Sequence, residues 1–238
     1  MTKTPIVSLS FFRFASPAAC VWALAMMGAA RFALPKVSGI GFWKLCGSGT
    51  GEGFTPLPNT AVYAILASWE DEETARKQTA QTEIYNRYRR RASEDWTIFL
   101  ETTSSRGQWS GKTPFDATGN TQTGALAALT RATIKPVTAI KFWRRVPDIS
   151  RMIGSDQNVV FKIGIGEMPL LHQITFSVWP NASSMAAFAR TNGPHAAAIQ
   201  AVREGNWFSE ELYARFAILG DSGSWDGKSP LDTLEYAA

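Results

Sequence analysis

The sequence predicts an α+β fold in which two tandem ferredoxin-like (βαββαβ) units pack as an α+β barrel. A ten-residue motif that begins at Gly107 recurs at Gly223, with six of its ten positions identical and a spacing of 116 residues. This spacing divides the chain in two, and the same order of strand and helix patterns can be read upstream of each copy. We therefore expect an N-terminal unit over residues 1–116 and a C-terminal unit over residues 117–238, with an interior that a flat cofactor can occupy.

The first half reads as strand, helix, strand, strand, helix, strand. Ser16 is a candidate N-cap, and Pro17 suits the first helical position. The second predicted helix has acids in its first turn and arginines in its last turn, as the helix dipole favours. A loop rich in glycine and proline, residues 47–59, separates the two middle strands. The expected strands cover residues 6–14, 41–46, 61–69 and 96–102, and the expected helices cover residues 17–34 and 71–91.

The second half repeats this order of elements. Asn181 is a candidate N-cap for a second helical region, which a turn-forming segment at residues 191–194 interrupts before it continues through Ala201. The expected strands cover residues 125–134, 159–165, 171–179 and 213–219, and the first helix of this half covers residues 137–152.

The apolar run from Ala18 to Ala30 has the composition of a signal-peptide centre, but two features favour another interpretation. An apolar, strand-like segment precedes it in place of a basic leader. The run of thirteen residues is also too short to span a bilayer. The sequence therefore predicts a buried helix in a cytoplasmic protein.

The composition is that of a globular chain rich in aromatic residues. Hydrophobic residues make up 45% and charged residues 18%, which excludes the composition of a disordered chain. Nine Trp and fourteen Phe either form an ordinary core or line a pocket for an extended apolar or planar ligand. Cys20 and Cys46 belong to no C-x-x-C pair, which argues against a disulfide framework and a zinc site.

The net charge of +4 is concentrated in one segment, residues 85–91, which mixes four arginines with two tyrosines. Three interpretations are open: a solvated helix face, contact with anionic lipid headgroups, or contact with nucleic-acid phosphates. No nucleic-acid-binding signature accompanies the segment, so we expect no nucleic acid partner.

Only two histidines occur, which narrows the search for a metal ligand. His195 restarts a helical segment whose next residues are small, so its imidazole could bind haem iron with Phe188, Trp207 and Phe208 as apolar walls. The competing interpretation is a capping or surface histidine. His172 lies on a predicted strand as a ligand, a distal proton donor or an ordinary hydrogen-bonded histidine.

Several stretches of the chain resemble the spheroidene monooxygenase family. The resemblance extends from about Ile6 to Pro230, and the departures lie at the termini and around residues 117–123. The stretches that carry it are Phe42–Lys44, Gly47–Gly51, Gly53–Pro56, Ala128–Thr133, Val160–Gly164, Gly166–Glu167, Gly193–His195, Asn206–Phe208 and Glu210–Phe216.

The resemblance implies a haem-dependent enzyme that uses molecular oxygen to place a keto group at C-2 of an acyclic carotenoid such as spheroidene. It implies His195 as the axial iron ligand. Arg131 and Lys162 lie in matching strand motifs, where they either steer oxygen protonation or form structural ion pairs. The external electron donor stays unidentified, with a ferredoxin as a candidate.

A carotenoid substrate also implies contact with a membrane surface. We expect a cytoplasmic protein that is peripheral on the inner membrane, and the barrel class favours a homodimer. Two alternatives stay open: a non-catalytic barrel that binds haem or pigment, and a haem enzyme with dehydratase or peroxide chemistry.

Overall fold

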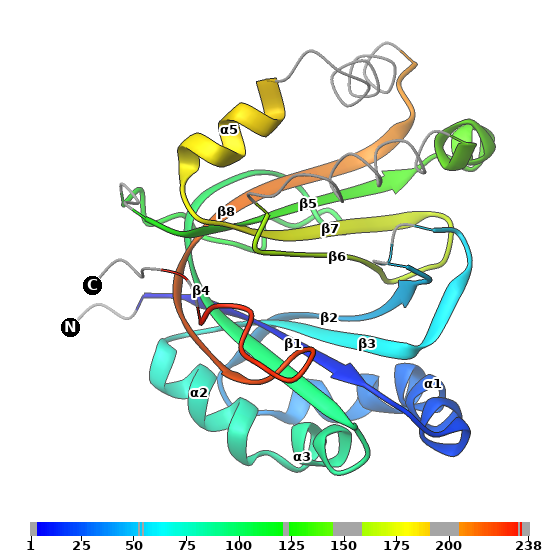
Figure 1. Cartoon of the computed structure of the whole chain (residues 1–238), viewed down its shortest axis with the longest axis vertical. Helices are drawn as coiled ribbons and strands as arrows, with labels where there is room; N and C mark the ends of the chain where they lie inside the picture. Colours follow the sequence, from blue (N-terminus) through cyan, green and yellow to red (C-terminus); the bar gives the residue numbers. More distant parts are fainter. Residues whose placement is uncertain are drawn as a thin grey trace.

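The computed structural model describes residues 4–51, 53, 55–120, 124–144, 159–190, 205–232 and 234. Within this part of the chain, eight antiparallel strands close into a barrel with helices outside it (Figure 1). The strands are β1 (Ile6–Arg13), β2 (Ile40–Gly49), β3 (Pro58–Trp69), β4 (Glu94–Gly107), β5 (Leu126–Ile134), β6 (Phe161–Gly166), β7 (His172–Trp179) and β8 (Phe208–Gly223).

The second half of the barrel repeats the strand order of the first. Around the barrel the order is β1-β3-β2-β6-β7-β5-β8-β4, so the halves read β4-β1-β3-β2 and β8-β5-β7-β6. β4 pairs with β8 along most of both strands, whereas the described pairs between β2 and β6 are Gly47↔Gly166 and Ser48↔Ile165. A mixed α and β protein with a closed antiparallel barrel is therefore confirmed, and the division into two ferredoxin-like units stays a prediction.

Helices lie outside the barrel in both halves of the chain. In the second half, η2 leads into a helix over residues 139–144, and α5 packs on β7. The remainder of the helix expected over residues 137–152 lies outside the described residues, as does the segment from 191 to 201. The helical elements are α1 (Pro17–Ala33), η1 (Leu34–Lys36), α2 (Glu72–Gln81), α3 (Glu83–Arg89), η2 (Pro136–Thr138) and α5 (Ala182–Arg190).

The predicted helix starts are confirmed. Side-chain oxygens of Ser16, Asp71 and Asn181 each accept a hydrogen bond from the backbone N–H three residues later, which caps α1, α2 and α5. The single helix expected over residues 71–91 is wrong. Thr82 has an extended backbone with ψ of 144°, and it divides this segment into α2 and α3.

The prediction of a buried first helix is also wrong. Along α1, Ala23, Met26 and Ala30 pack on the barrel, but Leu24 and Phe32 are 58% and 78% exposed. With η1 the helical stretch is 20 residues long, so by length and apolar composition it would suffice to cross a membrane. α1 is therefore a surface helix with an apolar outer face.

Strand alternation produces two separate cores. Inward side chains from all eight strands fill the barrel, where Phe11 and Trp96 stack with ring centroids 5.5 Å apart. Outward side chains of the first half, among them Phe12 and Tyr63, pack against the helices. Because aromatic rings occupy the centre, the expected interior for a flat cofactor is a packed core instead.

Several strands are longer than the sequence pattern predicted. β4 continues to Gly107 and β8 continues to Gly223, because these two strands pair with each other beyond their apolar stretches, and β8 begins at Phe208 because its start pairs with β5. β2 and β3 extend into the loop expected over residues 47–59. Main-chain pairing holds these ends, and their side chains carry no apolar alternation that would mark them as strands.

The repeated motif forms the same turn twice. In each copy the tryptophan bridges the lysine three residues later, at Trp109 and at Trp225. The glycine that opens each copy has a positive φ, and a Cβ on Gly107 or Gly223 would lie 2.1 or 2.2 Å from a backbone carbonyl oxygen of the neighbouring strand. Glycine is required at both positions, because any side chain would push the strands apart.

Candidate functional site

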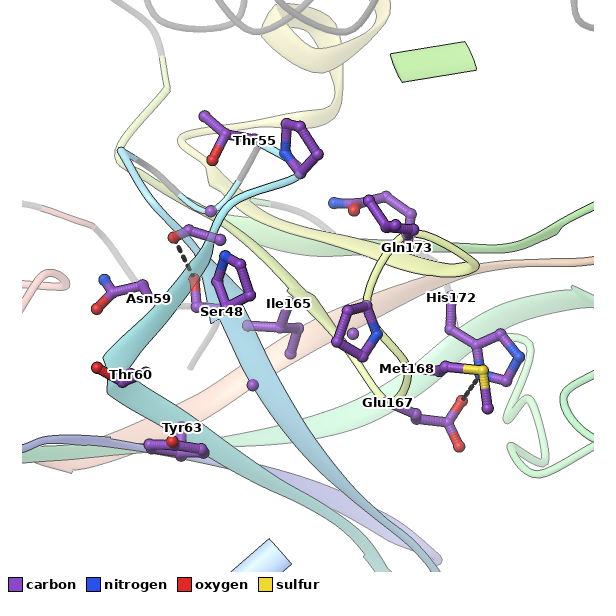
Figure 2. Close-up of a pocket in the computed structure, with 18 of the residues that line it drawn as sticks. Ser48, Thr55, Asn59, Thr60, Tyr63, Ile165, Glu167, Met168, His172 and Gln173 are labelled. Atoms are coloured by element: carbon purple, nitrogen blue, oxygen red, sulfur yellow. Dashed lines mark hydrogen bonds and ion pairs between the residues drawn. The ribbon is translucent and has the colours of Figure 1, made fainter. Parts of the chain in front are cut away.

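A pocket of about 250 Å³ opens at one end of the barrel, between α1, the β2–β3 loop and the β6–β7 turn. Figure 2 shows Ser48, Thr60 and Tyr63 on one side of it and the β6–β7 residues on the other. Its lining is mostly apolar, with little polar surface. The apolar residues that line it include Leu24, Met27, Pro56, Pro58, Tyr63, Trp143, Ile165, Met168 and Leu170.

The polar groups of this pocket gather where β6 turns into β7. Glu167 and His172 lie side by side there (Figure 2), with the Glu167 Oε2 atom 3.4 Å from the His172 Nδ1 atom. The other carboxylate oxygen of Glu167 is 2.6 Å from the Lys44 ammonium, and the Trp109 indole N–H donates to Oε2 at 2.8 Å. The carboxylate is therefore held by three neighbours.

Arg131 extends this network behind the pocket. Its side chain is buried, ion-paired to Glu210, and 3.8 Å from the Glu167 carboxylate. Glu210 also accepts hydrogen bonds from the backbone N–H groups of Ser110 and Gly111, at 2.9 and 2.7 Å. A buried cation thus joins the pocket carboxylate to the turn of the first repeated motif.

The electrostatics of the network favour charged carboxylates. Burial raises the pKa of Glu167, but the adjacent His172 imidazole, the Lys44 ammonium and the Trp109 indole N–H outweigh it and lower this pKa to about 2. Burial likewise opposes ionisation of Glu210, while backbone N–H groups and Arg131 lower its pKa. Both groups are acceptors near neutral pH. The His172 imidazole and the Gln173 amide in the same pocket are groups that can both donate and accept a hydrogen bond.

The two cysteines do not provide a thiolate at this pocket. Burial, together with the negative charge of Glu167, raises the pKa of the Cys46 thiol. A buried neutral thiol behaves as a small apolar side chain. Cys20 lies on α1, where its thiol donates to the backbone carbonyl of Phe14.

The structure separates the two residues with a predicted catalytic role. Arg131 lies in the ion-pair network, the arrangement expected of a structural pair, and reaches the pocket through Glu167. Lys162 lies on β6 beside a second hollow of about 510 Å³, which Arg13 and Trp225 also line. A catalytic role for either residue stays a prediction.

The predicted cofactor residues fall at different places. His195 lies outside the described residues. Phe188 of α5 packs on Trp179, the last residue of β7. Trp179 pairs with Leu126, the first residue of β5. Trp207 and Phe208 lie at the start of β8, beside the last residue of β5. Phe188 is thus at the opposite end of β5 from the other two.

The outer face of β5 and of the middle of β7 is built from small or short side chains. Where β1 and β3 place Phe12 opposite Tyr63, the corresponding pair on β5 and β7 is Thr130 opposite Thr175. Between these residues this floor has no large aromatic ring of the kind that packs under the helices of the first half, and Trp179 at its edge packs on Phe188 of α5. The small or short side chains of the floor are Ala128, Thr130, Ala132, Thr175 and Ser177.

Sequence reasoning missed the roles of Lys44, Glu167 and Trp109. The duplication carried a usable signal, because Arg13 and Arg131 occupy matching strand positions and each pairs with a glutamate that caps a motif turn. Aligning the strands of the two halves, as well as the motif itself, would have indicated Arg131 and its glutamate. Nothing in the sequence pattern placed Glu167 beside His172.

The comparisons with known proteins agree on one group of relatives. No family model matches the chain. The spheroidene monooxygenase of Cereibacter sphaeroides is 51% identical over 227 residues, covering 94% of this chain and 70% of that protein. The enzyme of the same name from Rhodobacter capsulatus is 50% identical over 230 residues, covering 95% of each, and that of Rubrivivax gelatinosus is 33% identical over 213 residues, covering 90% of this chain and 82% of that protein.

Among solved structures, an aldoxime dehydratase in complex with butyraldoxime superposes with a TM-score of 0.60 at 8% identity. The match covers 91% of this chain and 80% of that one, and it shows a shared fold. The sequence relatives go further, because half of all positions are identical over nearly the whole chain. The chain therefore belongs to the spheroidene monooxygenase family and is an oxidoreductase of the monooxygenase class.

Proposed function

We propose that this protein is a haem-dependent monooxygenase that uses molecular oxygen to place a keto group at C-2 of an acyclic carotenoid such as spheroidene. The observation that carries the proposal is the identity of about half of all residues to two spheroidene monooxygenases, over nearly the full chain. The apolar pocket beside Glu167 supports it, since an extended polyene needs apolar walls and few polar contacts.

The pocket takes one end of the substrate. Its volume of about 250 Å³ is too small for a whole carotenoid, so the rest of the polyene must lie outside it. Glu167, His172 and Gln173 offer hydrogen-bonding groups to an oxygen-bearing end group. Arg131 acts as a positioning residue in this proposal, because it holds the Glu167 carboxylate from behind.

The residues present also suit a haem on the second half. The floor of Thr130, Thr175 and their small neighbours leaves room that large rings fill in the first half. His195 would hold the iron, and haem would supply oxygen activation with electrons from an external donor such as a ferredoxin. The repeated strand order supports two ferredoxin-like units, of which the second, residues 117–238, carries the cofactor.

Spheroidene-producing cells test the proposal. Expression of the full chain is expected to give the 2-keto product in air and none under nitrogen. The purified protein is expected to show a haem absorption band that His195→Ala loses. His172→Gln is the matched control, because the chain has two histidines: it should keep the haem band.

Each other outcome contradicts a stated part of the proposal. Haem binding without any ketone in air would indicate a pigment- or haem-binding barrel. A carotenoid product that forms equally under nitrogen would indicate a different reaction. Loss of the haem band in His172→Gln with retention in His195→Ala would reverse the ligand assignment.

A further inference from the structure

The outer face of α1 is an exposed apolar surface beside the pocket. Val21, Leu24 and Phe32 are 69%, 58% and 78% exposed, and helical periodicity places them on one face. Leu24 also lines the pocket. The apolar face of the helix is therefore continuous with the pocket mouth.

Exposed apolar side chains continue across the mouth. Val137 and Ile140 are 87% and 71% exposed, and Leu170 of the β6–β7 turn is 47% exposed. The Trp143 indole N–H donates to the Leu170 carbonyl at 2.8 Å, which ties the helix over residues 139–144 to this turn. Figure 1 shows α1, the β2–β3 loop, the β6–β7 turn and that helix at the same end of the barrel. We call these exposed residues the mouth patch: Val21, Leu24, Phe32, Val137, Ile140 and Leu170.

The charges around the mouth patch are basic. No Asp or Glu occurs between Ala15 and Gly51 or between Ile134 and Pro147. Arg31, Lys36, Lys141 and Arg144 are exposed within those stretches. The β6–β7 turn of Leu170 carries an acid, Glu167, which is paired with Lys44. Apolar side chains flanked by cations are typical of surfaces that lie on anionic bilayers.

We propose that the mouth patch docks this protein on an anionic lipid bilayer, with α1 lying in the plane of the interface. Ala23, Met26 and Ala30 pack on the barrel, so α1 keeps its place on the protein while its other face enters the lipid. The pocket then opens toward the acyl chains. This last step rests on the proposed function, since a carotenoid dissolved in the bilayer would reach the pocket without crossing water.

The segment over residues 85–91 is a weaker candidate for the same role. Tyr85 and Tyr88 are buried, so they offer no aromatic surface to lipid. Arg89 pairs with Asp95, Arg90 pairs with Glu83, and the guanidinium of Arg91 lies over the Trp22 ring at 4.5 Å. These arginines are engaged within the protein, and we relocate the expected lipid contact to the mouth patch.

Flotation of the purified full chain with pigment-free vesicles tests the docking. Vesicles of equal parts phosphatidylcholine and phosphatidylglycerol are expected to carry the wild-type protein, and phosphatidylcholine alone to carry less. The double variant Val21→Asp with Phe32→Asp is expected to bind at least about tenfold more weakly, since two large side chains lose their burial in lipid. The double variant Lys36→Gln with Lys141→Gln should weaken binding to the anionic vesicles and leave binding to phosphatidylcholine vesicles unchanged.

Two control variants complete the test. Ala80→Asp places one new negative charge on an exposed position of α2, against two in the double variant, and is expected to bind like the wild type. Arg87→Gln with Arg90→Gln removes charge from α3 and its C-cap and is also expected to bind normally. Circular dichroism should show the same fold for every variant, because all substituted positions lie at least partly exposed.

The proposal is overturned if the wild-type chain does not float with anionic vesicles, or if the Val21→Asp, Phe32→Asp variant floats equally well. A wild-type dimer that this variant converts to a monomer, without vesicle binding by either, would show that a second copy of the chain covers the patch. Docking without ketone formation would reject the proposed function and leave the docking intact.

Discussion

Arg13 and Arg131 hold matching positions on the first strands of the two halves, but their surroundings differ. Arg13 contacts Glu94 at 2.8 Å and lies 4.2 Å from the centre of the Trp225 ring, and its side chain is 33% exposed. Arg131 pairs with Glu210 in the equivalent way, yet its side chain is 2% exposed. The same arginine–glutamate pair thus has a partly exposed arginine in one half and a buried arginine in the other.

We predict that Arg131→Met destabilises the protein by about 3 kcal/mol, because it removes a buried cation from the two partly buried carboxylates that it contacts. Arg13→Met is the matched control, with an expected cost of about 1 kcal/mol or less for a partly exposed pair. Urea unfolding followed by circular dichroism measures both. Equal losses of unfolding free energy in the two variants would show that burial of the arginine does not set the strength of the arginine–glutamate pair.

Glu167 makes the stability of the protein depend on pH. Its pKa is about 2 in the folded protein, below its ordinary value of 4.5. A depressed pKa means that the folded state binds this proton less tightly than the unfolded state. The contribution is therefore complete above about pH 4.5 and is lost as the pH falls toward 2.

We predict that Glu167→Gln lowers the free energy of unfolding at neutral pH and flattens its decline between pH 4.5 and about 2. Unfolding free energies measured across this range check it. Glu83→Gln is the control, because its carboxylate is on the surface in an exposed pair with Arg90 and is expected to change the profile little. An unchanged acid limb in Glu167→Gln would contradict the assignment.

At the scale of elements, the sequence pattern identified most helices and strands, and its errors have definable causes. Capping by Ser16, Asp71 and Asn181 is local chemistry, so it was predictable. The C-terminal ends of β4 and β8 depend on pairing between the two halves, which no local pattern records. The break at Thr82 follows from a single extended residue inside a helical composition.

The first helix shows the limit of composition most clearly. An apolar helix is expected in a core, but the described barrel provides a surface for one face of α1 alone. The exposed face borders a pocket that Trp143 and Leu170 also line, and these two residues lie far from α1 in the sequence. The candidate site followed the same rule: Arg131 was a sequence prediction, whereas the position of Glu167 required the turn that brings it to Lys44 and His172.

At the scale of the whole molecule, the two halves share one interior. Phe11 of the first half lies 6.1 Å from Phe176 of the second, between ring centroids, and Phe115 lies 5.5 Å from Phe216. β4 pairs with β8 along most of its length, which completes the sheet of each half. A half without its partner would expose this core and leave the edges of β2 and β4 unpaired, which favours aggregation.

We therefore predict that residues 1–116 and residues 117–238, expressed separately, do not fold as stable monomers, although the motif repeat divides the chain there. Co-expression of the two fragments is expected to restore a complex with the circular dichroism and the single unfolding transition of the whole chain, because the shared core and the β4–β8 pairing re-form without a covalent link. Size-exclusion chromatography and thermal unfolding of each fragment and of the pair measure this. A fragment that unfolds cooperatively as a monomer would show that its sheet and helices suffice alone, and that the barrel interior is an interface between independent domains.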